Sequence, residues 1–402
     1  GRIQGWWASR EDVVLSPPTY AAYRAYLQAQ EVWRSNDSLA EVRLRESISL
    51  DSTFLDAHFL LMDLFYNHQR YADRDSMIKA LQPRTATFSH RQSDLYAYHR
   101  TDAAGDLVGA YRYFLKELNR DILDPFYNTS GMVMTIGYVN QLDRGLSLFR
   151  MLPPDSLDFE DCTYCQTRLT LATWAFAQKG MIDSSQWVAQ FIPPVSVRNV
   201  NTMALPAVIL GDTARLTEML NLARESDNIN EEQIWNFMVR YALIAGHDSL
   251  SQQLARTALA HFDTTYARAV TVECNYWLGN YGKVMQIIKD AWLPAYAAHE
   301  YVAPWASRAI ARTGTSEEMD AWHVHLDSLE ASDPYHYGKY AYIRGVISSI
   351  RGKEDRAMDH LLDAYRKGHD FSYSIPCYQT DPDLMPLFDH PRWEGLMDPL
   401  NN

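Results

Sequence analysis

The sequence predicts an all-α protein built from a repeated pair of antiparallel helices. Turn-forming glycines recur regularly: steps of 31, 35, 33, 35 and 38 residues separate Gly180, Gly211, Gly246, Gly279, Gly314 and Gly352. Each glycine lies between two amphipathic segments of about 12 residues. No stretch alternates polar and apolar residues with a period of two, as a half-buried strand would. A fixed period in this range is typical of helical repeat proteins.

Length and composition narrow the class further. A chain of 402 residues is too long for one ordinary core, so several domains or an elongated array are expected. The chain is 47% hydrophobic and has only 18 Gly and 17 Pro, which argues against disorder and against an all-β protein rich in turns. It contains no uncharged apolar run of about 18 residues, so we expect no membrane span. The sequence shows no signal peptide and begins at Gly1 without Met, so we expect a processed or truncated piece, which a membrane span could precede.

The charge balance excludes one large class of partners. The chain has 37 basic and 50 acidic residues, a net charge of −13. Nucleic-acid binders need clustered basic residues to neutralise phosphates, and no basic run occurs, so we expect no nucleic acid as a partner. Acidity of this size generally maintains solubility, and the alternative is a preference for basic partners.

The clearest repeat unit lies near residues 340–364. Gly345 precedes Ala357 by twelve positions, and Leu361 and Ala364 follow four and seven positions after Ala357. Two antiparallel helices approach closely only where one side chain is very small, and the i, i+4, i+7 positions then form the packing stripe of the second helix. The unit therefore predicts a helical hairpin with its closest contact at Gly345.

The same template fits earlier segments less regularly. Ala40, Leu44 and Ser47 form one such stripe, and Ala110 and Phe114 follow the turn at Gly105. Several prolines are expected between hairpins, where they leave the helical hydrogen bonds intact: Pro83, Pro153, Pro154, Pro193, Pro194 and Pro334. We expect about ten hairpins, in an array over residues 18–369 that follows an N-terminal extension (1–17) and precedes a C-terminal cap (370–402).

The residue types and the period resemble the tetratricopeptide repeat, which implies a right-handed superhelical solenoid. Three stretches are similar to a narrower family: residues 17–27 (PPTYAAYRAYL), 50–58 (LDSTFLDAH) and 381–387 (DPDLMPL), the last running into His390-Pro391-Arg392-Trp393. They resemble the C-terminal tetratricopeptide regions of bacterial signalling proteins, which follow a kinase, an adenylate cyclase or a winged-helix domain. The resemblance implies a sensory or scaffolding role, in the cytoplasm or in the periplasm.

The resemblance also implies where a partner would bind. In a tetratricopeptide superhelix the first helix of each hairpin lines the concave groove. Positions one and four after its small residue, and three before it, point into the groove. The rule selects His99, Trp174, Asn201, Asn236, Arg240, Glu273, Tyr276, Arg308 and Tyr342. A polar and aromatic lining of this kind suits an extended peptide. Two alternatives remain open: the charges pair with one another and bind nothing, or the aromatic groove binds a small molecule or a sugar.

The sequence gives little support to a catalytic function. No His-Glu-x-x-His, Gly-x-Ser-x-Gly or phosphate-binding glycine loop occurs, and His323 and His325 would point apart on a helix. We expect no enzyme, cofactor or metal site. Cys162 and Cys165 form a lone Cys-x-x-Cys, for which two half-buried thiols are the expected state and a redox or metal role the alternative. Asp102 and Asp106 are expected to cap backbone amides.

The last thirty residues depart from the repeat. Leu384, Leu387, Phe388, Trp393 and Leu396 are too apolar to remain in water. We expect them to fold back over the last hairpin, because a terminal repeat exposes an apolar face that needs a cover.

Overall fold

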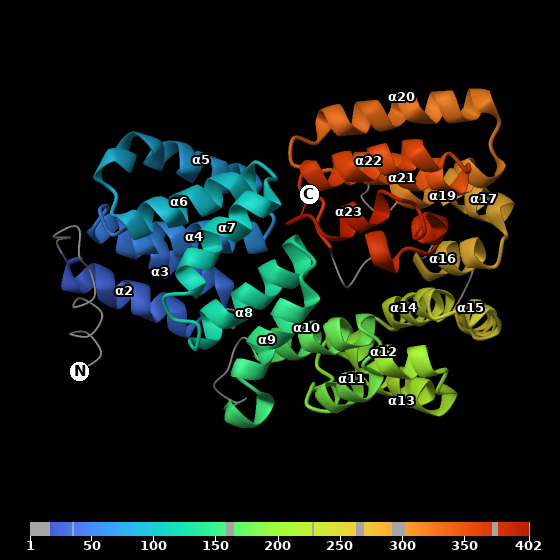
Figure 1. The fold of residues 1–402 in the computed structure, drawn as a ribbon, viewed down its shortest axis with the longest axis horizontal. Coiled ribbons are helices and arrows are strands. Elements are labelled where there is room, and N and C mark those ends of the chain that lie inside the picture. The colour runs from blue at the N-terminus through green and yellow to red at the C-terminus, as the bar shows by residue number, and fades with distance from the viewer. Residues whose placement is uncertain are drawn as a thin grey trace. The chain divides into compact units, whose positions relative to one another are not determined.

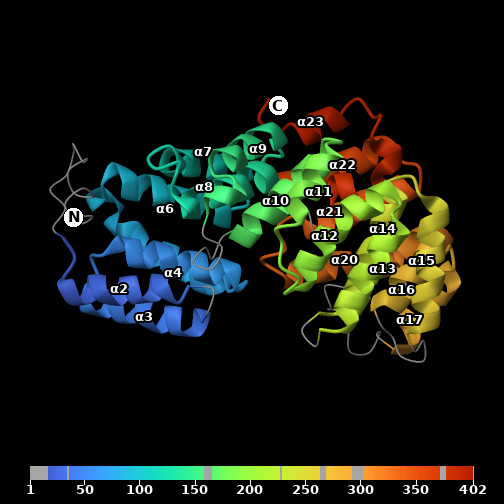
Figure 2. The same ribbon diagram turned by 90° about the horizontal axis from the view of Figure 1, so that it is seen from below.

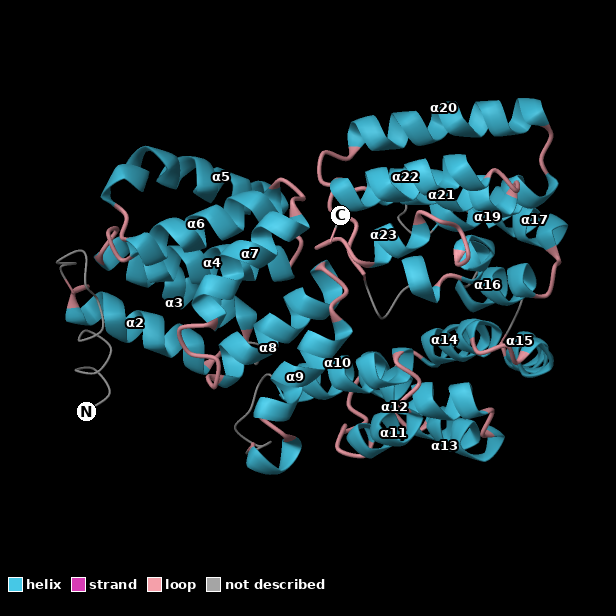
Figure 3. Ribbon diagram, viewed as in Figure 1, coloured by secondary structure: helices cyan, strands magenta, loops and turns pink. Residues whose placement is uncertain are grey.

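The computed structural model is helical throughout the part of the chain that it describes, with no strand in that part (Figures 1 and 3). It describes residues 17–33, 36–157, 165–226, 229–262, 269–291, 302–371 and 377–401. Most of the predicted N-terminal extension lies outside these ranges. Residues 1–122 and 123–402 form two compact units. Among the described helices, none combines the length and apolar character that crossing a bilayer requires.

Unit 1 consists of consecutive helices that pack as neighbours. They are α2 (Tyr20–Glu31), α3 (Asp37–Leu50), α4 (Leu55–Asn67), α5 (Tyr71–Leu81), the 3-10 helix η1 (Gln82–Thr87), α6 (His90–Ala103) and α7 (Leu107–Leu118). The predicted stripe Ala40, Leu44 and Ser47 is fully buried on α3. The Ser47 hydroxyl donates to the carbonyl oxygen of Ala22 at 2.8 Å, which ties α3 to α2.

Unit 2 contains a longer series of helices. They are α8 (Pro125–Val133), the π-helical turn η2 (Met134–Tyr138), α9 (Leu142–Met151), η3 (Pro154–Ser156), α10 (Cys165–Gln178), α11 (Ile182–Ala189), α12 (Val197–Leu210), α13 (Thr213–Arg224), α14 (Glu231–Ile244), α15 (Asp248–His261), α16 (Ala269–Trp277), α17 (Tyr281–Ala291), α19 (Val302–Thr313), α20 (Ser316–Ser332), α21 (Lys339–Ile350), α22 (Glu354–Arg366), η4 (Tyr378–Thr380), η5 (Pro382–Leu387) and α23 (Trp393–Met397).

The predicted glycine turns are real in most cases. At the end of α12, Gly211 has φ 68°, its N–H donates to Val208 O, and the N–H of Asp212 donates to Ala207 O. This left-handed ending satisfies carbonyl groups that the helix leaves free, and glycine adopts it without a Cβ clash. Other predicted turn glycines with positive φ are Gly105, Gly180, Gly246, Gly279 and Gly352. Gly314 is the exception; there a Cβ would lie 2.8 Å from Ile310 O, so crowding is what favours glycine.

The hairpin predicted near residue 345 is formed by α21 and α22. A Cβ placed on Gly345 would lie 2.6 Å from Leu361 Cδ2, so the close approach of the two helices depends on the missing side chain. Ala357, Leu361 and Ala364 are fully buried on α22, as the stripe predicted.

One row of helices organises unit 2. Helices α10, α12, α14, α16, α19 and α21 each pack against the next. We call this set the inner row. The described residues 377–401, which we call the returning segment, lie against α14, α21, α22 and inner-row side chains described below.

The predicted cover of the last hairpin is confirmed. Leu384, Leu387, Trp393 and Leu396 join one core with the buried side chains of α21 and α22. Phe388 stays 37% exposed and packs its ring against Trp393 at 4.8 Å.

The returning segment and the end of α22 also reach the start of unit 2 (Figure 2). Tyr365 Oη donates to Tyr138 O at 2.8 Å, and Gln141 Nε2 donates to Asp398 Oδ1 at 2.9 Å. Asn140 Nδ2 donates to Met397 O at 2.9 Å. These bonds connect the first and the last elements of unit 2.

Candidate functional site

Two carboxylates of the returning segment lie among polar side chains of the inner row. Asp381 and Asp383 are 0% and 3% exposed. The side chains that contact them come from three helices: Tyr276 from α16, Arg308 and Arg312 from α19, and Tyr342 and Ser349 from α21. We call these five residues the carboxylate cradle.

Arg308 is the centre of the cradle and is only 2% exposed. Its Nη2 donates to Asp381 Oδ2 at 2.6 Å, and its Nη1 donates to Asp381 Oδ1 at 3.1 Å. Nη1 also donates to Asp383 Oδ2 at 2.5 Å. The planar guanidinium therefore binds one carboxylate through both nitrogens and joins the second to it, a geometry that lysine cannot supply.

Asp383 has two further donors. Arg312, one helical turn after Arg308, donates from Nη2 to Asp383 Oδ1 at 2.7 Å. Tyr276 Oη lies 3.0 and 2.9 Å from the two oxygens of the same carboxylate. Its side chain is held between helices, because its ring packs against Trp305 at 5.4 Å.

Helix α21 completes the cradle. Tyr342 Oη donates to Asp381 Oδ2 at 2.6 Å, and Ser349 Oγ donates to the backbone oxygen of Asp383 at 2.6 Å. The serine contact holds the main chain of the segment rather than a side chain. The cradle therefore binds both the acidic groups and the backbone of the segment.

The local sequence of the segment presents both carboxylates to the cradle. Asp381 caps η5 and accepts a hydrogen bond from the Asp383 N–H at 3.0 Å. Pro382 is the first residue of η5, where its fixed φ and missing N–H cost nothing. Asp-Pro-Asp thus forms a tight, preorganised turn.

The charges in the cradle stabilise one another. Burial alone would lower the pKa of Arg308, but Asp381 and Asp383 outweigh it and raise that pKa well above its ordinary value. Burial, followed by Asp383, raises the pKa of Tyr276. Burial and then Asp381 do the same for the pKa of Tyr342. Both tyrosines therefore remain hydrogen-bond donors, and the cradle is suited to binding anions rather than to proton transfer.

Three of the nine side chains predicted to line a groove, Tyr276, Arg308 and Tyr342, thus meet in the cradle. Arg240 and Glu273 lie on α14 and α16 and form an ion pair at 3.7 Å. For these two charges the structure shows the mutual pairing that the sequence had left open.

The remaining predicted residues are not among the five that contact Asp381 and Asp383. Trp174 on α10 and Asn236 on α14 are buried, and Asn201 on α12 is partly exposed. His99 belongs to unit 1, where it is buried on α6 and stacks on Phe59 at 5.7 Å. Eight of the nine side chains are therefore buried, and Asn201 is the most accessible.

Sequence reasoning missed two of the five cradle residues and both of the carboxylates that they bind. Arg312, Ser349, Asp381 and Asp383 were not selected. Arg312 could have been found, because it follows Arg308 by four residues and so lies on the same helix face. The Asp381-Pro382-Asp383 motif was noted only for its resemblance, and its role as the internal ligand depends on a contact between residues 73 positions apart.

Two expectations about single residues need correction. Asp102 does not cap a helix: it forms a buried ion pair with Arg74. Asp106 does cap α7, because its side chain accepts a hydrogen bond from Gly109 N at 2.8 Å.

Cys165 is buried and disulfide-bonded rather than a half-buried thiol, and Cys162 lies outside the described residues. Cys274 and Cys377 are buried free thiols. No group of three or more potential metal ligands occurs among the described side chains.

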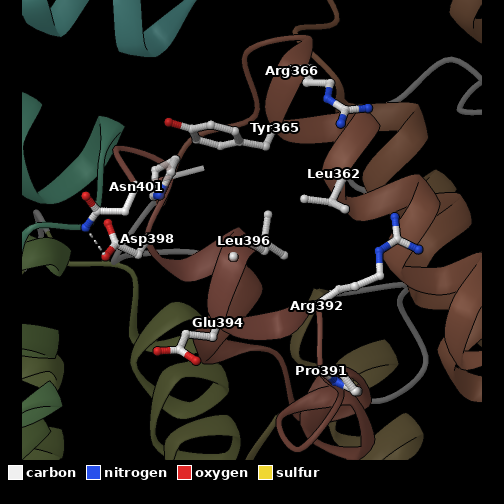
Figure 4. Close-up of a pocket in the computed structure, with 11 residues that line it drawn as sticks. Leu362, Tyr365, Arg366, Pro391, Arg392, Glu394, Leu396, Asp398 and Asn401 are labelled. Atoms are coloured by element: carbon white, nitrogen blue, oxygen red, sulfur yellow. Dashed lines mark hydrogen bonds between the residues drawn. The ribbon is translucent and has the colours of Figure 1, made fainter.

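A separate depression of about 840 Å³ lies between α22 and α23 (Figure 4). Leu362 and Leu396 form apolar walls, while Arg366, Arg392 and Glu394 bring charges to its edge. Arg392 is already paired with Asp359 at 2.8 Å. The depression combines apolar and charged surface but lacks convergent hydrogen-bond donors comparable to those of the cradle.

Comparison with known proteins yields no matching family model and no matching curated protein.

Proposed function

We propose that this chain is a non-catalytic, tetratricopeptide-like right-handed solenoid of about ten hairpins that binds a protein or peptide along its inner row. We further propose that it is the sensory or scaffolding part of a bacterial signalling or regulatory protein. Paired neighbouring helices, left-handed glycine turns and the Gly345 contact support the repeat architecture. The signalling role rests on the sequence resemblance.

One observation carries the binding proposal. Inner-row side chains from three helices already hold a tight polypeptide turn, through hydrogen bonds to its carboxylates and to its backbone. Helical repeat proteins present extended concave surfaces on which they bind their ligands. The ligand seen here is the chain's own, which gives direct information on the chemistry that the inner row accepts.

The test is selection of a displayed peptide library on the intact chain, followed by affinity measurements on two variants. Asn201→Arg places a long charged side chain on α12 of the inner row. Asn221→Arg makes the same change at an exposed position of α13. We expect selected peptides to lose at least tenfold in affinity for the Asn201 variant and to bind the Asn221 variant unchanged. Equal affinity for both variants would refute binding along the inner row.

A second candidate is a receptor for a small molecule or a sugar. The depression between α22 and α23 favours it, because it combines apolar walls with charged groups at its edge. A thermal-shift screen separates the two candidates. Stabilisation by small molecules, together with no selected peptide, would replace the first candidate with the second.

A further inference from the structure

We propose that the carboxylate cradle is a recognition site for acidic segments of the type Asp-x-Asp, and that the returning segment is its resident, exchangeable occupant. This inference rests on the proposed function and names the chemistry of the partner. The partner would present two carboxylates two residues apart and would enter by displacing Asp381 and Asp383.

The first argument is the number and the origin of the donors. Arg308, Arg312, Tyr276 and Tyr342 aim their donors at just two carboxylates. Asparagine at the same positions of a ligand would offer one acceptor oxygen in place of two and no negative charge, so several of these buried donors would lose their acceptors. A site built to hydrogen-bond a group strongly rejects analogues that lack the group. The cradle therefore selects for paired carboxylates.

The second argument is the charge that remains when the segment leaves. Arg308 is 3% exposed at its side chain, and both of its described carboxylate partners belong to the returning segment. A buried cation without a counter-ion is strongly unfavourable. An empty cradle would therefore demand another anionic ligand, which couples release of the segment to capture of an acidic partner.

The third argument concerns what opposes the exchange. The same segment buries Leu384 and Leu387 against α21 and α22, and it remains tethered to the chain. A tethered ligand has an effective concentration of about 1 mM or more. A free acidic peptide therefore binds the native chain weakly, and mutations that weaken the resident carboxylates should expose the site.

The experiment uses the full chain and a fluorescently labelled peptide with the sequence of residues 376–389. The proteins are the native chain, the double variant Asp381→Asn/Asp383→Asn, and the control Asp389→Asn. Asp389 lies in the same segment but is exposed, and no contact of its side chain with the cradle occurs in the structure. A second peptide carries Asn at the positions of Asp381 and Asp383.

We expect the double variant to bind the acidic peptide at least tenfold more tightly than the native chain or the Asp389 variant does. It should bind the Asn peptide at least tenfold more weakly than the acidic one. Circular dichroism and hydrogen exchange establish that the proteins are folded. If the double variant does not fold, the single variant Asp383→Asn carries the test, with the same direction expected.

Two results would overturn the inference: equal affinity of the folded variant and the native chain for the acidic peptide, or equal binding of both peptides. The proposed function fails separately. If selected peptides lose affinity for the Asn201→Arg variant, binding along the inner row is supported even when the cradle binds no acidic peptide.

Discussion

Arg74 in unit 1 and Arg308 in unit 2 are both buried, and they are neutralised in different ways. In unit 1, Arg74 is 1% exposed and pairs with Asp102, a residue 28 positions away on the next helical pair. In unit 2, Arg308 pairs with two aspartates more than 70 positions away, and both belong to the returning segment. Arg74 is therefore neutralised by a neighbouring helix of its own unit, whereas Arg308 is neutralised by a segment that follows the last long helix, α22.

The largest effect is expected from removing the charge of Arg308. Arg308→Met leaves Asp381 and Asp383 buried without their main partner, so we expect a loss of about 3–5 kcal/mol in the stability of unit 2. Hydrogen exchange with mass spectrometry would show the loss at residues 377–401 and α21. Arg312→Met is the matched control, because its side chain is 35% exposed and contacts one carboxylate only. Arg74→Met should produce its effect in unit 1 alone. Equal, small losses for Arg308→Met and Arg312→Met would contradict the dependence on Arg308.

We expect acid to lower the stability of unit 2 through protonation of His369. Burial lowers its pKa to about 4, and its ring stacks on Tyr342 at 4.4 Å. An unfolded histidine has a pKa of about 6.5, so between these values the unfolded state binds the extra proton. Neutral His369 therefore contributes its full share to the stability of unit 2 above pH 6.5. This share, about 3 kcal/mol at most, is lost as the pH falls through 4.

The measurement is urea unfolding of unit 2 at several pH values. His369→Phe keeps an aromatic ring against Tyr342 but cannot take up a proton, so its stability should change less between pH 6.5 and 4. Parallel pH profiles for the native chain and the variant would exclude His369 as the source of the acid sensitivity.

Hydrogen bonds to charged and to neutral acceptors can be compared within unit 2. Tyr342→Phe removes a donor to the Asp381 carboxylate, and we expect a loss of about 2 kcal/mol. Tyr365→Phe removes a donor to the neutral carbonyl of Tyr138 and should cost about 1 kcal/mol. Denaturant unfolding of both variants tests the order; a larger loss for Tyr365→Phe would contradict it.

The smallest expected effect is the pH dependence that Asp63 gives to the stability of unit 1. Burial and then Asp102 raise the pKa of Asp63 to about 7, although 32% of its side chain is exposed. A raised pKa means that the folded state holds the proton longer, so stability falls as the pH rises from about 4 to 7. Asp63→Asn should therefore stabilise unit 1 by about 1 kcal/mol at pH 8, a value reduced because the side chain is partly hydrated. Equal stability gains at pH 4 and pH 8 would argue against titration of Asp63.

Local pattern was enough to predict the helical class, most of the glycine turns, the contact at Gly345 and the apolar cover of the last hairpin. Each of these depends on residues close in sequence or on a period. The cradle was predicted only in part. Tyr276, Arg308 and Tyr342 were selected by their helix positions, but periodicity does not encode which distant segment they meet. Asp102 was misinterpreted for the same reason, because a surface cap and a buried ion pair look alike in one sequence.

The bonds that join Asn140 and Gln141 to residues 397 and 398 also affect the order of folding. These partners are 257 positions apart. During synthesis, α8 and α9 emerge long before the residues that complete their hydrogen bonds exist. Unit 1 has all of its internal partners within the first 122 residues, so it can fold while the ribosome is still translating unit 2. Closure of unit 2 is a late, high-contact-order step, and premature termination before residue 381 would leave the inner row without its resident carboxylates.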